Sequence, residues 1–568
     1  MDRISQLSRR GAVAVCITLS ACAAAGPSGA ASYPPPNGAY GAFLAAHYAD
    51  ARNDPDAAAK YYGLALQAAP GNQTMIGQGF LAAVQAGGAQ AQDQAQDLAP
   101  QLSGNALALM LLGNQAALNG DYEKAGTIYA GLPQDELVGL IKPLLVGWSR
   151  FGQGNTQAAL KGLQPYFNTG AFAPVYVLNA AMIADAGHDT NDAAQYYGAV
   201  SNGQPNLRLA QILASWQARQ GQAALAAQEL DSLVQAHPDL QMALPGLQAR
   251  IAEPVVASPV QGLAEAYLTL AGSLNQPAAT FLRTVFLRYA LQLRPDLTAA
   301  RLLLADTLAA SDNPSATPTP VQMQNALASL APVTPDDALF APAALQQANL
   351  LSALGRPADA VAMLDKLIAM SPQDPGLLAN AGDMLRAANE MQAAIPYYSK
   401  AIVAIGSPPP PAAWSLFFDR GICEDSVNDW AAAEPDMLEA QALGPNQPYV
   451  LNYIGYSWAL HGEKLDQAHA LLERAVALDP NDGAVIDSLG FVNLKQGHTQ
   501  TALGLLTQAV QLDPDDAEVN GHLGDAFWQA GQKLQAAYQW QRALSLGPDA
   551  KLAAELKAKL QQNFPPVS

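Results

Sequence analysis

The C-terminal half of this 568-residue chain repeats itself every 34 residues, and no other feature of the sequence constrains the fold as strongly. The triplet Leu-Asp-Pro at 478–480 returns at 512–514, and Gly490 is matched by Gly524. Within residues 483–516, apolar side chains recur twice at helical spacing, with a break between the two runs. The sequence therefore predicts a repeating unit of two helices joined by a turn.

Small residues mark the eighth and twentieth positions of the units, as Gly490 and Ala502 do, with Phe80 as the exception at the eighth position. We expect the paired helices to cross at these positions, because only Gly or Ala lets two backbones approach closely. Pro514 lies between units, where a helix must stop because proline has no amide donor. Traced along the chain, the eighth position falls on Ala46, Phe80, Gly113, Gly147, Ala181, Ala214, Ala271, Ala305, Ala348, Gly382, Gly421, Gly455, Gly490 and Gly524.

This pattern resembles the tetratricopeptide repeat. The resemblance implies an all-α fold, a right-handed α-solenoid of about fourteen helix-turn-helix repeats over residues 39–550. One repeat cannot bury its apolar face alone, so neighbouring repeats stack and leave a concave groove along one side. The copies around Phe80 and Ala214 match the pattern weakly.

Proline-rich interruptions of the period predict the organisation of the chain. The largest is the 57-residue gap from Ala214 to Ala271, and another contains the segment 311–320. We expect the following parts: a lipoprotein signal peptide (1–21), a flexible tether (22–38), an N-terminal repeat block (39–250), an irregular joint with two repeats (251–320), a C-terminal repeat block (321–550), and a terminal capping helix with a tail (551–568).

The N-terminal segment predicts export and lipidation. A basic segment, residues 1–10, precedes an apolar stretch at 12–19 that is too short to span a bilayer. The motif Leu19-Ser20-Ala21-Cys22 resembles the lipobox of bacterial lipoproteins, which implies that Cys22 is acylated after cleavage. In such lipoproteins, Ala23 rather than Asp after the cysteine implies transfer to the outer membrane. The alternative is an ordinary secretory signal that is cut after another alanine.

The charge of the chain argues against nucleic-acid binding. The formal net charge is -19 and the isoelectric point is about 4.6, so the surface repels phosphate backbones and anionic headgroups. We therefore expect contact with a membrane only through the lipid anchor. Beyond residue 22 the chain holds one cysteine, Cys423, so no disulfide framework can form within the body of the protein.

No motif of an enzyme, a metal site or a cofactor site is present in the sequence. The seven histidines form neither an HExxH motif nor a cluster with cysteines. The Asp-rich turns between units lack the spacing of an EF-hand loop, and neither a phosphate-binding loop nor a GxSxG motif occurs. We therefore expect no catalytic residue, metal or cofactor, with an unrecognised catalytic site as the remaining alternative.

The resemblance also predicts a binding surface in the C-terminal block. In this family the groove is lined by positions 2, 5, 9, 12 and 13 of each first helix. The matching residues here are Phe418, Tyr449, Asn452, Tyr456, Asp487, Phe491, Lys495, Glu518, Asp525 and Trp528. Aromatic and acidic side chains together suit an extended peptide with apolar anchors and basic residues. For the two phenylalanines in particular, the alternative is packing within and between the repeats.

The combined prediction is a non-catalytic protein–protein interaction scaffold, lipid-anchored at the outer membrane and facing the periplasm. The partner would be a protein or an extended peptide segment. The alternative is a dedicated assembly subunit of a secretion, pilus or exopolysaccharide export apparatus. The sequence does not name the partner.

Overall fold

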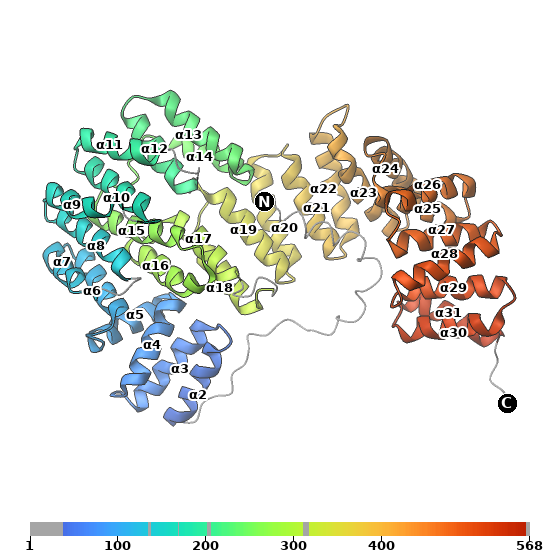
Figure 1. Cartoon of the computed structure of the whole chain (residues 1–568), viewed down its shortest axis with the longest axis horizontal. Coiled ribbons are helices and arrows are strands. Elements are labelled where there is room, and N and C mark those ends of the chain that lie inside the picture. Colours follow the sequence, from blue (N-terminus) through green and yellow to red (C-terminus); the bar gives the residue numbers. More distant parts are fainter. Residues whose placement is uncertain (1–37, 134–137, 169, 202–205, 311–316, 564–568) are drawn as a thin grey trace. The chain divides into compact units, whose positions relative to one another are not determined.

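The computed structural model describes residues 38–563 apart from 134–137, 169, 202–205 and 311–316, and within this part every regular element is a helix (Figure 1). The expected signal peptide, Cys22 and nearly all of the expected tether lie outside the described residues. None of the described helices combines the length and the apolarity that a membrane crossing requires.

The described residues form two compact units, which divide between Leu367 and Ile368. The N-terminal unit contains α2 (Gly38–Asp50), α3 (Pro55–Ala68), α4 (Gln73–Ala86), α5 (Ala89–Leu98), α6 (Ala106–Leu118), α7 (Tyr122–Ala130), α8 (Val138–Gly152), α9 (Thr156–Leu163), α10 (Ala173–Ala186), α11 (Thr190–Val200), α12 (Leu207–Arg219), α13 (Ala223–Ala236), α14 (Leu244–Ala249), α15 (Pro259–Ser273), α16 (Thr280–Leu293), α17 (Thr298–Ala309), α18 (Pro320–Leu330), α19 (Phe340–Ala353) and most of α20 (Pro357–Met370). The C-terminal unit contains α21 (Pro375–Ala387), α22 (Met391–Ala404), α23 (Trp414–Ser426), α24 (Trp430–Leu443), α25 (Pro448–His461), α26 (Leu465–Leu478), α27 (Gly483–Lys495), α28 (Thr499–Leu512), α29 (Ala517–Gln529), α30 (Lys533–Ser545) and α31 (Ala550–Asn563).

The helices pack as consecutive pairs, from α2 with α3 to α29 with α30. Thirteen such pairs are in contact in the described part of the chain, and α19 and α20 follow each other as a fourteenth. Each eighth position traced in the sequence falls in the first helix of a pair. The predicted all-α solenoid of about fourteen helix-turn-helix repeats is thereby confirmed. Short 3₁₀ segments and α14 account for the residues between some of the pairs.

Local sequence signals explain where the C-terminal helices begin and end. The Asp482 side chain accepts hydrogen bonds from the backbone N–H groups of residues 484 and 485, and Asp516 does the same for residues 518 and 519. Gly497 and Gly531 adopt left-handed φ angles of 81° and 77° at the turn inside each pair, a conformation that glycine adopts without steric cost. Aspartate caps and turn glycines thus set the helix ends.

Helix crossings inside the pairs depend on the small residues. A Cβ atom built on Gly490 in α27 would lie 2.6 Å from Cγ of Leu506 in α28, which is closer than real carbon contacts allow. The same holds for Gly455 in α25, whose Cβ would lie 2.6 Å from Cγ of Leu472 in α26. The restriction to Gly or Ala at the eighth position therefore follows from close contact with the second helix.

Replacing Gly490 with leucine should lower the free energy of unfolding of the C-terminal unit by about 1–3 kcal/mol, because the larger side chain forces α27 and α28 apart. The measurement is urea unfolding followed by the protection of α27 amides from hydrogen exchange. Gly504→Leu in α28 is the matched control, because Gly504 is exposed and a Cβ there meets nothing within 4 Å. Equal stability of the two variants would contradict a close crossing of α27 and α28 at Gly490.

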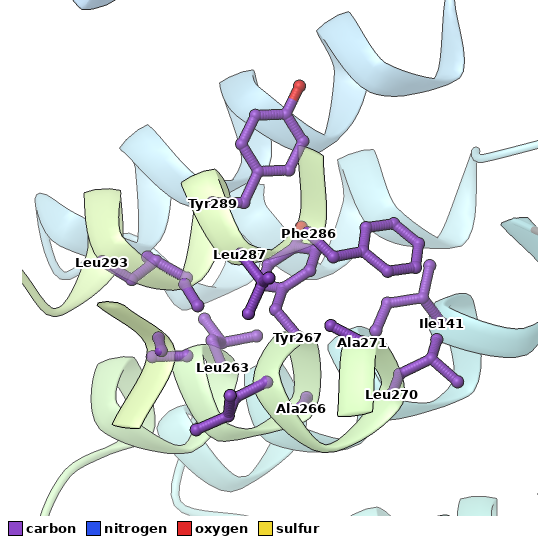
Figure 2. Packing of buried hydrophobic residues seen from close by; sticks show 14 of the residues in the cluster. Ile141, Leu263, Ala266, Tyr267, Leu270, Ala271, Phe286, Leu287, Tyr289 and Leu293 are labelled. Atoms are coloured by element: carbon purple, nitrogen blue, oxygen red, sulfur yellow. The ribbon is translucent and has the colours of Figure 1, made fainter. Parts of the chain in front are cut away.

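In the N-terminal unit, the pair α15–α16 does not continue the row of repeats but folds back onto it. Figure 1 shows both helices inside the arc that α4 to α12 form. Here α15 packs against α6, α8 and α10, and α16 packs against α4 and α6. In Figure 2, Ile141 of α8 lies beside Leu270 and Ala271 of α15, within one buried cluster that also contains Phe286 of α16.

The segment expected as an irregular joint with two repeats, 251–320, contains this folded-back pair. The segment contributes its first pair to the core of the preceding repeats, and α17 follows that pair in the same unit. Neither expected boundary, at 250/251 or at 320/321, coincides with the division between the two compact units. At the long gap in the repeat period, the chain leaves the row of repeats and folds back onto the concave side of that row.

Candidate binding surfaces

The concave side of the N-terminal repeats is bound by the chain itself. Asn114 follows the small residue of the third pair. In the repeats that this chain resembles, that position lines the groove. Its amide oxygen accepts hydrogen bonds from the hydroxyl groups of Tyr129 (2.8 Å) and Tyr267 (3.1 Å), and its amide nitrogen donates to Gln292 (3.3 Å). Tyr267 lies on α15 and Gln292 on α16, so the polar groups of this groove position are used by the folded-back pair.

Trp148 occupies the same position in the next pair and packs directly on α15. A Cβ atom built on Gly262 would lie 2.2 Å from Cε3 of Trp148, so glycine is required where the indole meets the α15 backbone. The indole nitrogen donates to Asn179 of α10 at 2.9 Å, and Asn179 donates to Thr269 of α15 at 3.2 Å. Shape and hydrogen bonding together make α15 an internal ligand of this groove.

A buried ion-pair cluster holds α15 from its other side. Glu265 of α15 is fully buried and bonds to Arg208 of α12, with 3.0 Å between its Oε2 and the Arg208 Nε atom. Arg294, which follows α16, lies 3.3 Å from the same carboxylate and donates to the Val255 carbonyl oxygen at 3.0 Å. Two guanidinium groups thus neutralise one buried carboxylate.

Arg288 fixes α16 to the second repeat. Its Nε atom donates to the Gln85 carbonyl oxygen of α4 at 3.0 Å. Burial lowers the pKa of Arg288 to about 10, and the nearby Asp56 carboxylate opposes part of that shift. The guanidinium therefore remains protonated at neutral pH and keeps its hydrogen bond.

In the C-terminal unit, four of the sequence-predicted residues meet in one cluster. The Tyr456 hydroxyl donates to Glu518, and the Tyr456 ring lies 5.4 Å from that of Phe491. The ring of His522 stacks 4.4 Å from Phe491, and its Nδ1 atom lies 2.8 Å from Asp487. These residues come from the first helices α25, α27 and α29, as the repeat register predicts.

His522 is the member of this cluster that the sequence analysis did not select. Burial by itself lowers the pKa of His522, but the carboxylates of Asp487, Glu518 and Asp525 outweigh burial and raise the pKa from 6.5 to about 9. The imidazole is therefore protonated at neutral pH. His522 follows Gly521, which holds the fifth position of its first helix and so belongs to the groove positions of the family. This place, next to an aspartate of the preceding repeat, is the signal that could have identified His522.

Two further predicted residues, Asp525 and Trp528, face the end of the solenoid. Asp525 pairs with Lys559 of α31 at 2.7 Å and accepts a hydrogen bond from the Trp540 indole at 2.9 Å. The Trp528 ring lies 5.6 Å from the Trp540 ring. The Lys533 ammonium lies over the Trp528 ring, 5.1 Å from its centre. Asp487 and Asp525 thus each face a cation of the same chain, which reduces the charge that they present to a partner.

The remaining predicted residues differ in exposure. Phe418 is buried, and its ring stands edge-on to that of Tyr453 with 5.8 Å between the ring centres. Phe491 is equally buried, so both phenylalanines pack against neighbouring side chains of the repeats. Tyr449 is half-buried, and the exposed Lys495 places its ammonium 4.8 Å from the Phe491 ring centre. The half-buried Asn452 has a buried Oδ1 atom without a hydrogen-bond partner among the described contacts.

Among the described helices of the C-terminal unit, no pair covers the groove as α15–α16 cover the N-terminal one. Among the described residues after 375, each helix packs extensively only with helices one or two elements away in the chain. The groove positions of α23, α25, α27 and α29 therefore meet their own neighbours rather than a segment returning from elsewhere. Within the part of the chain that the structure describes, no group of three His, Cys, Asp or Glu residues could hold a metal ion.

Cys423 is a structural thiol in α23. It is fully buried, and burial raises the pKa of its thiol to about 12, with Arg386 opposing this shift. The thiolate is therefore scarce at neutral pH, which does not suit a nucleophile.

A family model described as "Tetratricopeptide repeat" matches residues 345–409 and 492–551. The chain contains tetratricopeptide repeats. A curated "TPR repeat-containing protein" of Pseudomonas aeruginosa is 30% identical over 166 residues. This match covers 28% of the present chain and 26% of that protein, so the chain spans about a quarter of the relative's length.

Solved structures are also similar to this chain. The crystal structure of YrrB, described as a TPR protein with an unusual peptide-binding site, is 21% identical, covers 34% of this chain and 97% of its own, and has a TM-score of 0.28. The crystal structure of the APC/C hetero-tetramer Cut9–Hcn1 is 15% identical, covers 92% of this chain and 96% of its own, and has a TM-score of 0.35.

Proposed function

We propose that this protein is a non-catalytic scaffold whose C-terminal tetratricopeptide repeats bind an extended segment of a partner protein. The observation that carries the proposal is the contrast between the two concave sides. The chain's own α15 and α16 occupy the N-terminal groove, whereas among the described helices of the C-terminal unit no returning pair covers the groove positions of α25, α27 and α29. A surface built from repeats and left uncovered is the place for an external partner.

The chemistry of this surface favours a partner with apolar and basic side chains. Half-buried aromatic side chains, Tyr449, Tyr456 and Trp528, supply the kind of anchor that often dominates interface energy. Residues 368–568 contain 23 Asp and Glu against 11 Lys and Arg, so the unit as a whole attracts cations. Glu518 accepts a hydrogen bond from a tyrosine hydroxyl and also lies near the protonated His522, so this carboxylate too is partly balanced within the chain.

The groove is tested by photo-crosslinking from position 449. A benzophenone amino acid in place of Tyr449 should capture a partner in cells, whereas the same probe in place of Tyr538 should not, because Tyr538 is 69% exposed on the second helix α30. Tyr449→Ala should then weaken binding of that partner about tenfold or more, by roughly 1.4 kcal/mol, because an aromatic anchor is lost. Undiminished binding by a folded Tyr449→Ala variant would place the interface elsewhere.

We further propose that the scaffold is lipid-anchored at the outer membrane and faces the periplasm. Residues Leu19 to Cys22 support this proposal through their resemblance to a lipobox, and the acidic surface supports attachment through acyl chains rather than through direct contact with anionic lipid. A protein held at the membrane by one end would present its repeats to soluble partners.

Cys22→Ser should move the protein from the membrane fraction to the soluble fraction, or leave it unprocessed, because the acylated thiol is lost. The measurement is cell fractionation with metabolic labelling by an alkyne fatty acid. Cys423→Ser is the matched control and should keep both the label and the membrane location. Labelling that persists in Cys22→Ser would refute the lipoprotein assignment.

A further inference from the structure

The first described helix, α2, presents an apolar stripe to solvent at the end of the row of N-terminal repeats (Figure 1). Its members Tyr40, Leu44 and Tyr48 are 73%, 49% and 55% exposed. They follow one another at intervals of four residues, which puts them on one face of the helix. The opposite face carries three buried alanines and packs on α3. The helix thus joins the repeat through small residues and leaves its large side chains at the surface.

The last repeat of the C-terminal unit is closed in another way. There α31 packs on α30, and Leu556 of α31 is buried in one cluster with Trp540. Stacked repeats need such a terminal cover, because the outer face of an end repeat otherwise exposes apolar surface to water. Among the described residues, no helix precedes α2 to cover the stripe in this way. The stripe is therefore a surface for something other than the described repeats.

The stripe lacks the acidic charge of the rest of the chain. Residues 38–49 contain no Asp, Glu, Lys or Arg, whereas the whole chain has a formal net charge of -19. Asp50, the first carboxylate after the stripe, lines the cavity beside α4 instead. The repulsion that argues against contact between this protein and anionic headgroups is therefore weakest at the stripe.

The side chains of the stripe suit the boundary between headgroups and acyl chains. Tyrosine is enriched at that boundary, because its ring is apolar and its hydroxyl group is polar. At one end of the stripe, Arg52 donates a hydrogen bond to the Tyr48 hydroxyl at 2.9 Å, and its guanidinium lies over the ring, 5.4 Å from the centre. Such a guanidinium can remain among phosphate groups while the apolar side chains face the membrane interior.

The chain that leads into α2 connects the stripe to the expected lipid anchor. Sixteen residues separate Cys22 from Gly38, where α2 begins. A chain of this length spans at most about 55 Å, and a flexible chain of the same length has a root-mean-square extent of about 20–24 Å. An acylated Cys22 would therefore hold the stripe at a high effective concentration next to the bilayer.

We propose that the stripe of α2 lies in the headgroup region of the membrane that carries the lipid anchor. The hydroxyl groups of Tyr40 and Tyr48 stay among the headgroups, and Leu44 reaches the upper part of the acyl chains. The acyl chains attach the protein, and the stripe orients its N-terminal unit on the bilayer. This inference rests on the proposed lipid anchoring and adds a second contact to it, where the net charge of the chain favoured the anchor alone.

The test is photo-crosslinking of the full chain in cells, with a benzophenone amino acid in place of Leu44. Mass spectrometry of irradiated and dark samples should show one phospholipid added to the peptide that contains residue 44. Gln67 is the matched position, because it is exposed on α3 of the same repeat and lies outside the stripe. The same probe at position 67 should give at least fivefold less phospholipid adduct.

A charge placed in the stripe tests whether the contact is apolar. With the probe in place of Tyr40, Leu44→Glu should lower the amount of phospholipid adduct at least fivefold, because a carboxylate resists transfer from water to acyl chains. Gln67→Glu adds the same charge to the same repeat and should leave the adduct unchanged. Both substituted side chains are exposed, so both variants should keep the parent's melting temperature, which is checked first.

The fatty-acid label on Cys22 separates this inference from the anchor on which it rests. A labelled parent in which residue 44 gives no more phospholipid adduct than residue 67 would overturn the role of the stripe and leave the anchor standing. A parent without the label would overturn the anchor and this inference with it. An adduct with a second copy of the chain or with another protein, in place of phospholipid, would assign the stripe to a protein partner and overturn the inference as well.

Discussion

Replacing Glu265 with alanine should destabilise the N-terminal unit by about 3–5 kcal/mol, because Arg208 is left buried without its counter-charge and Arg294 keeps only the exposed Asp296, 3.6 Å away. Arg208 and Arg294 are only 16% and 19% exposed, so water cannot replace the carboxylate at full strength. The same change frees α15 from α12 and so weakens the packing of the folded-back pair against the groove. We expect α15 and α16 to lose protection before the outer helices do.

Hydrogen exchange during urea unfolding, read for amides of α15, measures this effect separately from the C-terminal unit. The matched control is Asp359→Ala, which removes an ion pair with Arg356 whose two side chains are 55% and 54% exposed. An exposed pair contributes at most about 1 kcal/mol, so this variant should unfold nearly like the parent. Similar losses in the two variants would show that the Glu265 cluster does not hold α15.

The C-terminal unit should lose about 3 kcal/mol of stability as the pH rises from about 6 to about 10, because His522 then loses its proton. The carboxylates around it raise the pKa of His522 from 6.5 in the unfolded chain to about 9 in the folded protein. A raised pKa means that the folded state holds the proton more tightly. The stabilisation is therefore complete below pH 6.5 and is lost as the pH rises through about 9.

His522→Gln should remove most of this pH dependence, because glutamine keeps a hydrogen-bond donor near Asp487 but does not titrate. The comparison uses urea unfolding at a series of pH values, followed through the exchange of α27 amides. His498→Gln is the control, since His498 is exposed at the turn before α28. A parent protein and a His522→Gln variant that lose equal stability across this range would exclude His522 as the titrating group.

The candidate binding surface was only partly predictable, because the groove position of a residue says nothing about its other contacts. The register of the repeats brought Tyr456, Asp487, Phe491 and Glu518 to neighbouring first helices, as the resemblance implied. The sequence did not indicate that His522 pairs with Asp487 or that Lys559 pairs with Asp525, because neither pair of side chains recurs from repeat to repeat. These internal pairs reduce the acidic character that the groove offers to a partner.

What the sequence determined by itself was the local architecture: helix pairs, their caps and their close crossings. Those features depend on contacts within one unit or between adjacent units, such as Gly490 against Leu506, and they recur with the period. Only the tertiary structure decided that α15 and α16 fill the N-terminal groove. That arrangement rests on single contacts between distant residues, such as Tyr267 with Asn114 and Glu265 with Arg208, 153 and 57 positions apart. Such contacts leave no periodic signal in a sequence, because each forms once and depends on the shape that the whole unit has already taken.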